Sequence, residues 1–419
     1  MSQERRGIPR REFVKSAVAI GGASALAACL DRSPGPIPTG TDDPAALPER
    51  QHAWNGALAV DDAGNALNAR HHVLLLLDYT GDGKPTDADR ETVEAALRSL
   101  ERAYEHSNEG LLFTLGYSRA YFDRYDAAPA GVDLPRPEAL APFEDPDADT
   151  PDAVLHLASD RGDALLGAEE ALRGNQSEAN GVETTSWEGV FTVAGRRTGF
   201  VGSGLPAEHD DVSGVPEGAV DEDSPLYMGF KSGFRGAQAS EDRVTIQSGP
   251  FAGGATQHAS YIELNLDQWY EQDSRYQRVA KMFCPAHAEN DRVEGVGENL
   301  GASSGVASCE APEKTAREQG VVGHSQKMEG VREDGSPLIL RRDFDSTDGG
   351  RAGLHFVSLQ RDIGEFVETR EAMNGTDAAE ESAVGQRNNN GILQYMNVVS
   401  RGNYLLPPRS ERALPRAEP

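Results

Sequence analysis

Two residues that can do chemistry together lie in the segment GVVGHSQKMEGVREDGSPLILRRDFDS, residues 320–346. The imidazole of His324 can hold a transition metal such as iron, and the guanidinium of Arg341 can stabilise negative charge on a ligand bound beyond that metal. Each also has an ordinary interpretation. His324 is then a surface histidine in a polar loop, and Arg341 is a strand-edge arginine paired with a surface carboxylate. Nothing in the segment itself decides between the two, so the rest of the chain must.

Two cysteines form the other reactive pair. Cys284 and Cys309 close a loop of 309 − 284 = 25 residues. In an oxidising compartment they are expected to form a disulfide, which would constrain the unfolded chain by ~3 kcal/mol. The alternative is two free thiols. Two cysteines with no nearby pair of histidines do not make a zinc site.

The composition narrows the class of partner. The chain has 419 residues, a formal net charge of −28 and only six lysines. The electrostatic field of this negative charge repels phosphate backbones, so we do not expect nucleic acid as a partner. Acid-rich, lysine-poor surfaces suit very salty solvents, where counterions screen the self-repulsion. We therefore expect a halophilic source.

The first fifty residues have the composition of an export signal followed by a linker. Arg10 and Arg11 precede the apolar run SAVAIGGASALAACL, which predicts twin-arginine export. The run ends at Cys29, which predicts a lipidated cysteine in residues 1–29; otherwise Cys29 is simply a small apolar residue. Residues 30–50 are then a flexible tether to the outer face of the cell membrane, or the chain is secreted. This route carries folded proteins, which favours a cofactor protein.

Apolar patterns predict the same order of elements in two halves, 51–205 and 206–408. The first half has strands at 71–79, 110–118 and 152–160, with helices at 87–106 and 161–174. The second half has strands at 258–266, 337–344 and 353–360, with helices at 267–283 and 361–373. This is the ferredoxin-like α+β order. We expect an inserted loop at 285–319 and a disordered tail at 409–419.

A third acidic pattern resembles a calcium loop. Asp78, Thr80, Asp82, Thr86 and Asp89 have the spacing of calcium ligands, with Gly83 at the turn. Asp78 closes a strand rather than a helix, however, and Asp89 stands where such loops carry glutamate. The alternative is a solvated acidic turn.

Several segments together resemble the dye-decolorizing peroxidases. GLHFVSLQRDI beside PLILRRDF, with a histidine upstream, resembles the haem-binding half of that family. LLFTLGYSRAYFDRY and DAVLHLASDRGDALLGAEEAL resemble its first half, and MGFKSGFRG lies where the family carries a GxxDG motif. The resemblance covers most of residues 70–408 in the right order. It implies two ferredoxin-like halves of the dimeric α+β barrel type, with one haem b in the second half.

The resemblance also implies roles for individual residues. His324 matches the proximal haem ligand, and Arg341 matches the arginine that stabilises bound peroxide on the opposite face. Leu354 and Phe356 match the apolar pair over that face, which alternation along a strand places on one side.

One motif departs from the family. Gly229, Ser232 and Gly233 give GxxSG, whereas the family's aspartate acts as a general acid–base on peroxide. Serine cannot act as a carboxylate. Asp343 lies two residues after Arg341 and so on the same face of a strand, which would return a carboxylate to this side. The alternative is that Asp343 pairs with a neighbouring arginine and faces water.

The sequence therefore favours an exported, lipid-anchored haem peroxidase that oxidises a small reductant with hydrogen peroxide. The alternatives are a non-catalytic protein that binds haem or another porphyrin, and a haem-free surface lipoprotein with the same fold. The lost aspartate favours the alternatives. The histidine, the arginine and the apolar pair favour haem.

Overall fold

Two βαββαβ units make up the chain, and the computed structural model describes residues 35–380 and 382–419 of it. The first unit has the order β3 (His71–Tyr79), α3 (Asp87–Ala103), β4 (Leu112–Ser118), β6 (Ala153–Ser159), α5 (Gly162–Leu172) and β9 (Phe191–Phe200). The second has the order β10 (Ala255–Leu264), α8 (Arg275–Met282), β13 (Leu340–Arg341) with β14 (Phe344–Ser346), β15 (Gly353–Gln360), α12 (Ile363–Asn374) and β16 (Met396–Leu406). The predicted α+β class is confirmed.

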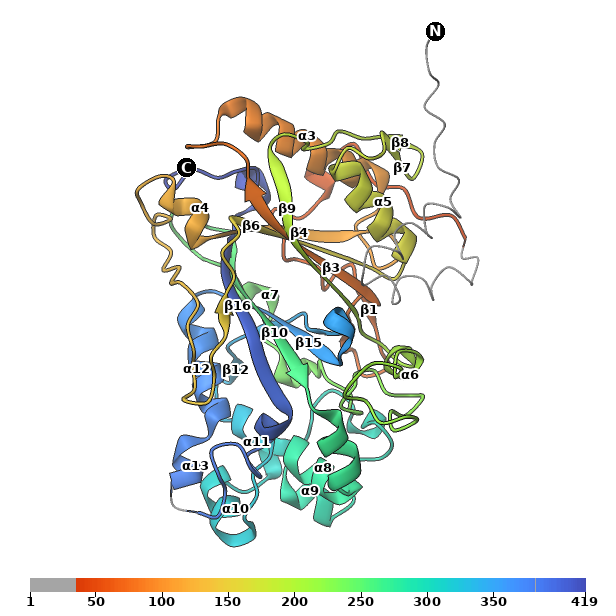
Figure 1. Cartoon of the computed structure of the whole chain (residues 1–419), viewed down its shortest axis with the longest axis vertical. Coiled ribbons are helices and arrows are strands. Elements are labelled where there is room, and N and C mark those ends of the chain that lie inside the picture. The colour runs from red at the N-terminus through yellow and green to blue at the C-terminus, as the bar shows by residue number, and fades with distance from the viewer. Residues whose placement is uncertain (1–34, 381) are drawn as a thin grey trace.

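The two units share one closed sheet. Its strands follow the order β10-β15-β14-β9-β3-β6-β4-β16, and β16 also pairs with β10, which closes the order into a barrel. The long strands β10 and β16 run through the middle of the molecule in Figure 1, with α3 and α5 at one end and α8, α11 (His324–Met328) and α12 towards the other. Closure leaves these main strands without free edges.

The continuous apolar run of β3 is explained by burial on both faces. Val73, Leu75 and Leu77 pack with α3 and α5 in the largest core cluster. Leu74 and Leu76 point the other way, into a cluster inside the barrel. Since neighbouring strand residues alternate between faces, a strand buried on both sides must be apolar throughout.

Two residues of the predicted calcium loop cap a helix instead. Thr86 accepts a hydrogen bond from the backbone N–H of Asp89, and the Asp89 carboxylate accepts one from the backbone N–H of Thr86. This capping box fixes the start of α3. Oδ2 of Asp89 also accepts a hydrogen bond from the Tyr79 hydroxyl at 2.7 Å, so this oxygen already has partners.

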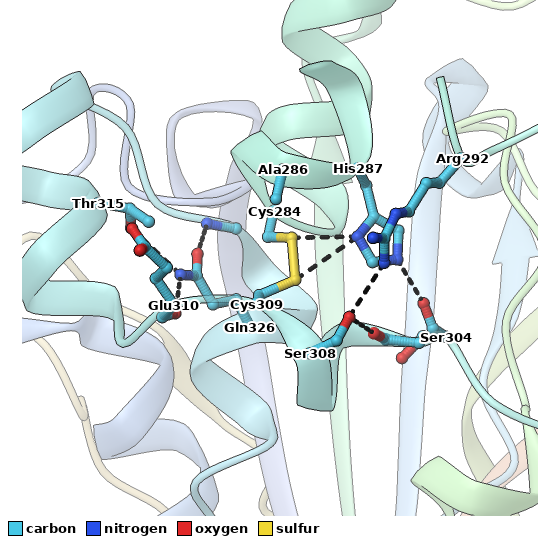
Figure 2. Close-up of a disulfide and its surroundings, with 12 residues drawn as sticks. Cys284, Ala286, His287, Arg292, Ser304, Ser308, Cys309, Glu310, Thr315 and Gln326 are labelled. Carbon is cyan, nitrogen blue, oxygen red and sulfur yellow. Dashed lines mark hydrogen bonds between the residues drawn. A yellow bond between two sulfur atoms is a disulfide. The ribbon is translucent and has the colours of Figure 1, made fainter. Parts of the chain in front are cut away.

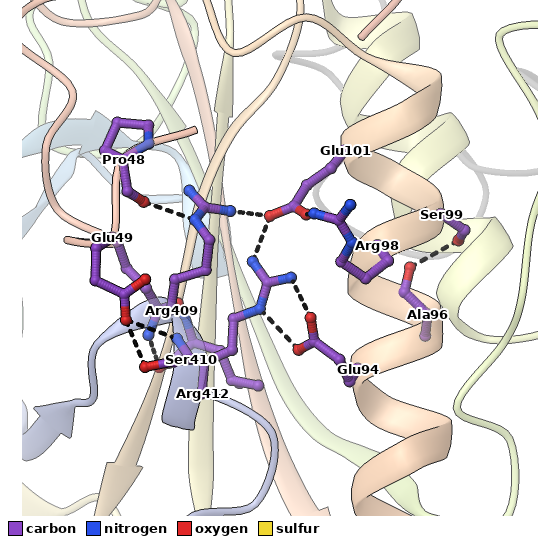
Figure 3. A network of polar contacts seen from close by, with 12 residues as sticks. Pro48, Glu49, Glu94, Ala96, Arg98, Ser99, Glu101, Arg409, Ser410 and Arg412 are labelled. Atoms are coloured by element: carbon purple, nitrogen blue, oxygen red, sulfur yellow. Dashed lines mark hydrogen bonds and ion pairs between the residues drawn. The ribbon is translucent and has the colours of Figure 1, made fainter. Parts of the chain in front are cut away.

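The prediction of a disordered tail at 409–419 is wrong. Arg412 is fully buried and pairs with Glu101 and Glu94 of α3, and Arg409 also pairs with Glu101 (Figure 3). Leu414 is buried in the same cluster as α3. Burying several charges is costly unless they are paired, and this network pairs them.

The flexible tether at 30–50 is also wrong for residues 35–50. The backbone of Gly40 and Thr41 bonds to carbonyls at the end of α3, and the Pro48 carbonyl accepts a bond from Arg409 at 2.7 Å. The segment therefore lies between α3 and the C-terminal tail. Residues 1–34, which carry the predicted signal, Cys29 and the start of the tether, lie outside the described residues.

The predicted loop at 285–319 is instead largely helical. It contains α9 (Pro285–Glu289) and α10 (Pro312–Gln319), with short 3-10 turns between them. Among the residues described here, no helix is both long enough and apolar enough to cross a membrane.

Candidate functional site

One face of the second half of the barrel carries a row of polar side chains. β13 and β14 pair with β15 in one register, with Arg341 opposite Ser358 and Asp345 opposite Leu354. This register places Asp343 opposite Phe356. Since alternate residues of a strand share a face, Arg341, Asp343 and Asp345 lie in one row beside the apolar row of β15.

A cavity lies between this face and the helices α11 and α12. About 230 Å³ of it is open to the centres of water-sized molecules, against the ~10–15 Å³ that a single water needs. The cavity is mostly apolar, and six of the predicted residues line it: His324, Arg341, Asp343, Leu354, Phe356 and Ser232. Side chains from separate elements, up to 124 residues apart in the chain (356 − 232), therefore meet at one place.

His324 begins the short helix α11 and faces the cavity from the helical side. The helix lies against Gly391, where an added Cβ would come within 3.1 Å of the His324 Cα. Burial, together with the positive charges of Lys327, Arg341 and Arg370, lowers the pKa of His324 to about 3. Its Nδ1 is buried without a hydrogen bond to any described residue. The imidazole is therefore neutral and able to act as a ligand.

The disulfide of Cys284 and Cys309 anchors this helix (Figure 2). The Gln326 side chain donates to the Glu310 carbonyl at 2.7 Å and to Thr315 at 3.1 Å. The backbone N–H of Gln326 donates to the Phe283 carbonyl, next to Cys284. Both ends of the bridged segment thus bond to α11, which holds His324 in place. The two sulfurs are committed to each other, so they offer no thiolate to a metal.

Arg341 and Asp343 do not adopt their ordinary alternatives. The backbone N–H of Arg341 donates to the Gln238 side chain, but its guanidinium makes no hydrogen bond or ion pair with any described residue. Asp343 is 9% exposed and likewise has no ion pair within the described part of the chain. A guanidinium and a carboxyl that face one cavity without partners are available to a ligand.

The GxxSG segment is irregular backbone that bends at Gly229. Gly229 and Gly233 have φ angles of 77° and 75°, a region that glycine enters without strain. At Gly229 a Cβ would also approach the Tyr270 hydroxyl to 2.9 Å. Ser232 itself lines the cavity between these two glycines.

Sequence reasoning missed several charged residues of the cavity wall, among them Glu144, Asp345, Arg370 and Arg401. The Glu144 side chain is buried and pairs with both Arg370 and Arg401, the latter at 2.8 Å. Asp345 is 1% exposed. Asp345 could have been found by extending the alternation of Arg341 and Asp343 by two residues. Glu144 lies in a loop and carries no pattern that points to the cavity.

Comparison with known proteins identifies the fold. A dye-decolorizing protein from V. cholerae matches with a TM-score of 0.52 and 14% identity, over 86% of this chain and 98% of that chain. A variant of DypB from Rhodococcus jostii RHA1 in complex with heme matches with a TM-score of 0.51 and 15% identity, over 83% and 96%. A putative dyp-type peroxidase from Shewanella oneidensis matches with a TM-score of 0.50 and 16% identity, over 82% and 94%. At these identities the matches establish the fold alone.

The family itself comes from the sequence. No curated protein matches the chain significantly. One family model, described as a family of unknown function, matches residues 69–408, which span both halves of the barrel. The chain therefore belongs to this family, DUF7405, and is a divergent protein with the dye-decolorizing peroxidase fold.

Proposed function

We propose that the protein is a haem-dependent peroxidase that reduces hydrogen peroxide and oxidises a small reductant. The observation that carries this proposal is the cavity in which a neutral histidine on α11 faces an unpaired arginine and an apolar pair on the sheet. A structural neighbour with the same fold binds heme. This likeness supports the proposal without assigning an activity to the chain.

The residues of the cavity fit a haem. The group needs a neutral donor atom, a mostly apolar surround and cations for its carboxylates. His324 offers the donor, and the lining includes Met282, Phe283 and Ile392 on the helical side. Lys231, Arg332 and Arg387 also line the cavity and are candidates to pair with the two carboxylates.

Each cavity residue then has a defined task. Bound haem would supply the metal on which peroxide is reduced. His324 would hold that metal, while Arg341 would orient peroxide and stabilise the negative charge that develops as its O–O bond breaks. Leu354 and Phe356 would exclude bulk water. In the overall exchange, one peroxide and two hydrogen atoms from the reductant become two waters.

The first test is an absorption spectrum. The parent chain, produced with haem available and kept in high salt, is expected to show a haem Soret band that His324→Ala loses or shifts. His106→Ala is the matched control, since His106 bonds to the backbone carbonyl of Ala53, outside the cavity. A folded parent without the band would refute the proposal.

A non-catalytic porphyrin-binding protein is the second candidate. Ser232 favours this candidate, because a serine lines the cavity where the dye-decolorizing peroxidases carry the aspartate of the GxxDG motif. Both candidates predict the Soret band. Only the first predicts peroxide-dependent oxidation of a dye, so a turnover assay separates them.

We also propose that the chain is exported by the twin-arginine route and anchored through a lipid on Cys29. The disulfide supports an oxidising compartment. The Cys29→Ala variant is expected to move the protein from the membrane fraction to the soluble fraction, because it removes the anchor. An Arg10→Lys, Arg11→Lys variant should instead keep it inside the cell. Equal membrane fractions for parent and Cys29→Ala would exclude the anchor.

A further inference from the structure

A second carboxyl group shares the cavity with Asp343. Asp345 is 1% exposed, lines the cavity and stands two residues further along the same face, opposite Leu354. Within residues 35–380 and 382–419 it has no cationic partner. A buried carboxyl without a counter-charge is costly when ionised, so such a position points to a function or to a retained proton.

The carboxyl of Asp345 lies against the altered motif. One of its oxygens accepts a hydrogen bond from the backbone N–H of Tyr227, two residues before Gly229. Tyr227 is itself fixed, because its carbonyl accepts the Tyr270 hydroxyl at 2.6 Å. Asp345 therefore faces the cavity from the strand that adjoins the GxxSG segment. A carboxyl is present there although Ser232 does not supply one.

The surroundings keep this carboxyl protonated. Burial raises the pKa of Asp345 well above its ordinary value, and the negative charge of Asp343 raises it further, whereas the Tyr227 N–H lowers it. The nearby phenols of Tyr227 and Tyr270 also have raised pKa values, chiefly through burial, and stay neutral. Two neighbouring carboxyls cannot both ionise cheaply, so one holds a proton while the other is free to take one.

We propose that Asp345 is the general acid of the cavity and that it works with Asp343 as the base. The inference rests on the proposed peroxidase function. Asp343 would take a proton from one oxygen of the bound peroxide. As the O–O bond breaks, the electron pair would leave with the other oxygen, which takes the proton of Asp345 and departs as water. The oxygen left behind would become the second water by taking two hydrogen atoms from the reductant. Transfer of a proton from Asp343 to Asp345 would restore the pair.

A purely structural role makes a different prediction. If Asp345 only accepts the Tyr227 N–H, an asparagine in its place keeps that bond and the local backbone. The proton would then have no catalytic consequence. The two roles therefore differ in what Asp345→Asn does to the chemistry, not in what it does to the fold.

The experiment compares the haem-loaded parent, Asp345→Asn, Asp343→Asn and the double variant Ser232→Asp, Asp345→Asn. We expect Asp345→Asn to keep the Soret band and to lower peroxide turnover by roughly 10²- to 10⁴-fold, the range that a general acid supplies. The loss of turnover at alkaline pH, where the parent's acid is deprotonated, should disappear in this variant. Ser232→Asp should restore much of the turnover, because it returns a carboxylate to the motif. Asp345→Ser replaces the asparagine variant if that variant does not fold.

Infrared difference spectra provide a readout that does not depend on turnover. At neutral pH the parent should show the carbonyl band of a protonated carboxylic acid, and Asp345→Asn should lack it. If the parent is active and Asp345→Asn has the same turnover and pH profile, Asp345 is not the general acid, whereas the proposed peroxidase function still stands. Loss of turnover that Ser232→Asp does not restore would also overturn the assignment of Asp345, in favour of a structural role. A parent that binds no haem or does not consume peroxide would instead refute the proposed function together with this inference.

Discussion

Arg341→Ala is expected to lower the rate of peroxide-driven turnover by about 10²–10³-fold, the usual effect of removing one preorganised donor that stabilises developing negative charge. The haem Soret band should remain, because Arg341 lies on the sheet side of the cavity and His324 lies on the helical side. The guanidinium of Arg341 has no partner among the described residues, so its removal breaks no ion pair of the fold. Steady-state turnover with a dye, beside the spectrum of each variant, measures the effect.

Two matched variants sharpen this test. Arg351→Ala removes an arginine whose side chain is 47% exposed and lies outside the cavity, so its turnover should equal that of the parent. Arg341→Lys keeps the charge but loses the planar fork of donors, so it should recover only part of the rate. If Arg341→Ala turns over as fast as the parent, the arginine does not act on peroxide.

The pattern of alternation was the most informative signal in the sequence. It predicted correctly that Arg341 and Asp343 share a face, and that Leu354 and Phe356 share another row of the same sheet. Such predictions succeed because the two-residue repeat of a strand is a local property. The pairing of those rows with His324 depends on how α11 packs against Gly391 and the disulfide loop, and no local pattern encodes it.

The C-terminal tail, in contrast, could not be predicted from a local pattern. Residues 409–419 are rich in charge and proline, which is typical of disorder, yet Arg409 and Arg412 are buried against α3. Their partner Glu101 lies more than 300 residues earlier, on a helix whose own amphipathic pattern gives no reason to expect a buried glutamate. Composition describes an isolated segment, whereas this segment is ordered by a distant partner.

Acid is expected to unfold the protein cooperatively as the pH falls below about 5. Four of the buried histidines that play no part in the proposed chemistry illustrate the effect, and burial is the main cause of their lowered pKa values. The pKa is lowered to about 4 for His52 and to about 3 for His71, His156 and His258. These histidines are neutral in the folded chain. In the unfolded chain their pKa returns to the ordinary value of 6.5, so below that pH they take up protons. Their stabilising contribution is therefore complete above pH 6.5 and is lost as the pH falls towards the folded values.

The size of this effect follows from proton linkage. Each such histidine costs about 1.4 kcal/mol of stability for every pH unit below its unfolded pKa. Near pH 4.5 the four together would remove roughly 10 kcal/mol, which is comparable with the whole stability of a typical domain. Asp345 acts in the opposite direction, since its raised pKa means that the folded chain binds its proton more tightly than the unfolded chain does. One carboxyl cannot offset four imidazoles.

Denaturant unfolding at constant high salt, repeated between pH 8 and pH 4, measures the free energy of unfolding against pH. His258→Gln is the informative variant, because glutamine can keep a bond to Asn403, whose side-chain oxygen lies 2.7 Å from His258 Nδ1. In acid, the free energy of unfolding of this variant should fall less steeply with pH, by the contribution of about one proton taken up on unfolding. The other three histidines stay in place. A free energy of unfolding that stays flat from pH 7 to pH 5 would mean that these histidines already bind protons in the folded chain. In that case the polar contacts around them, rather than their neutrality, would stabilise the interior of the barrel.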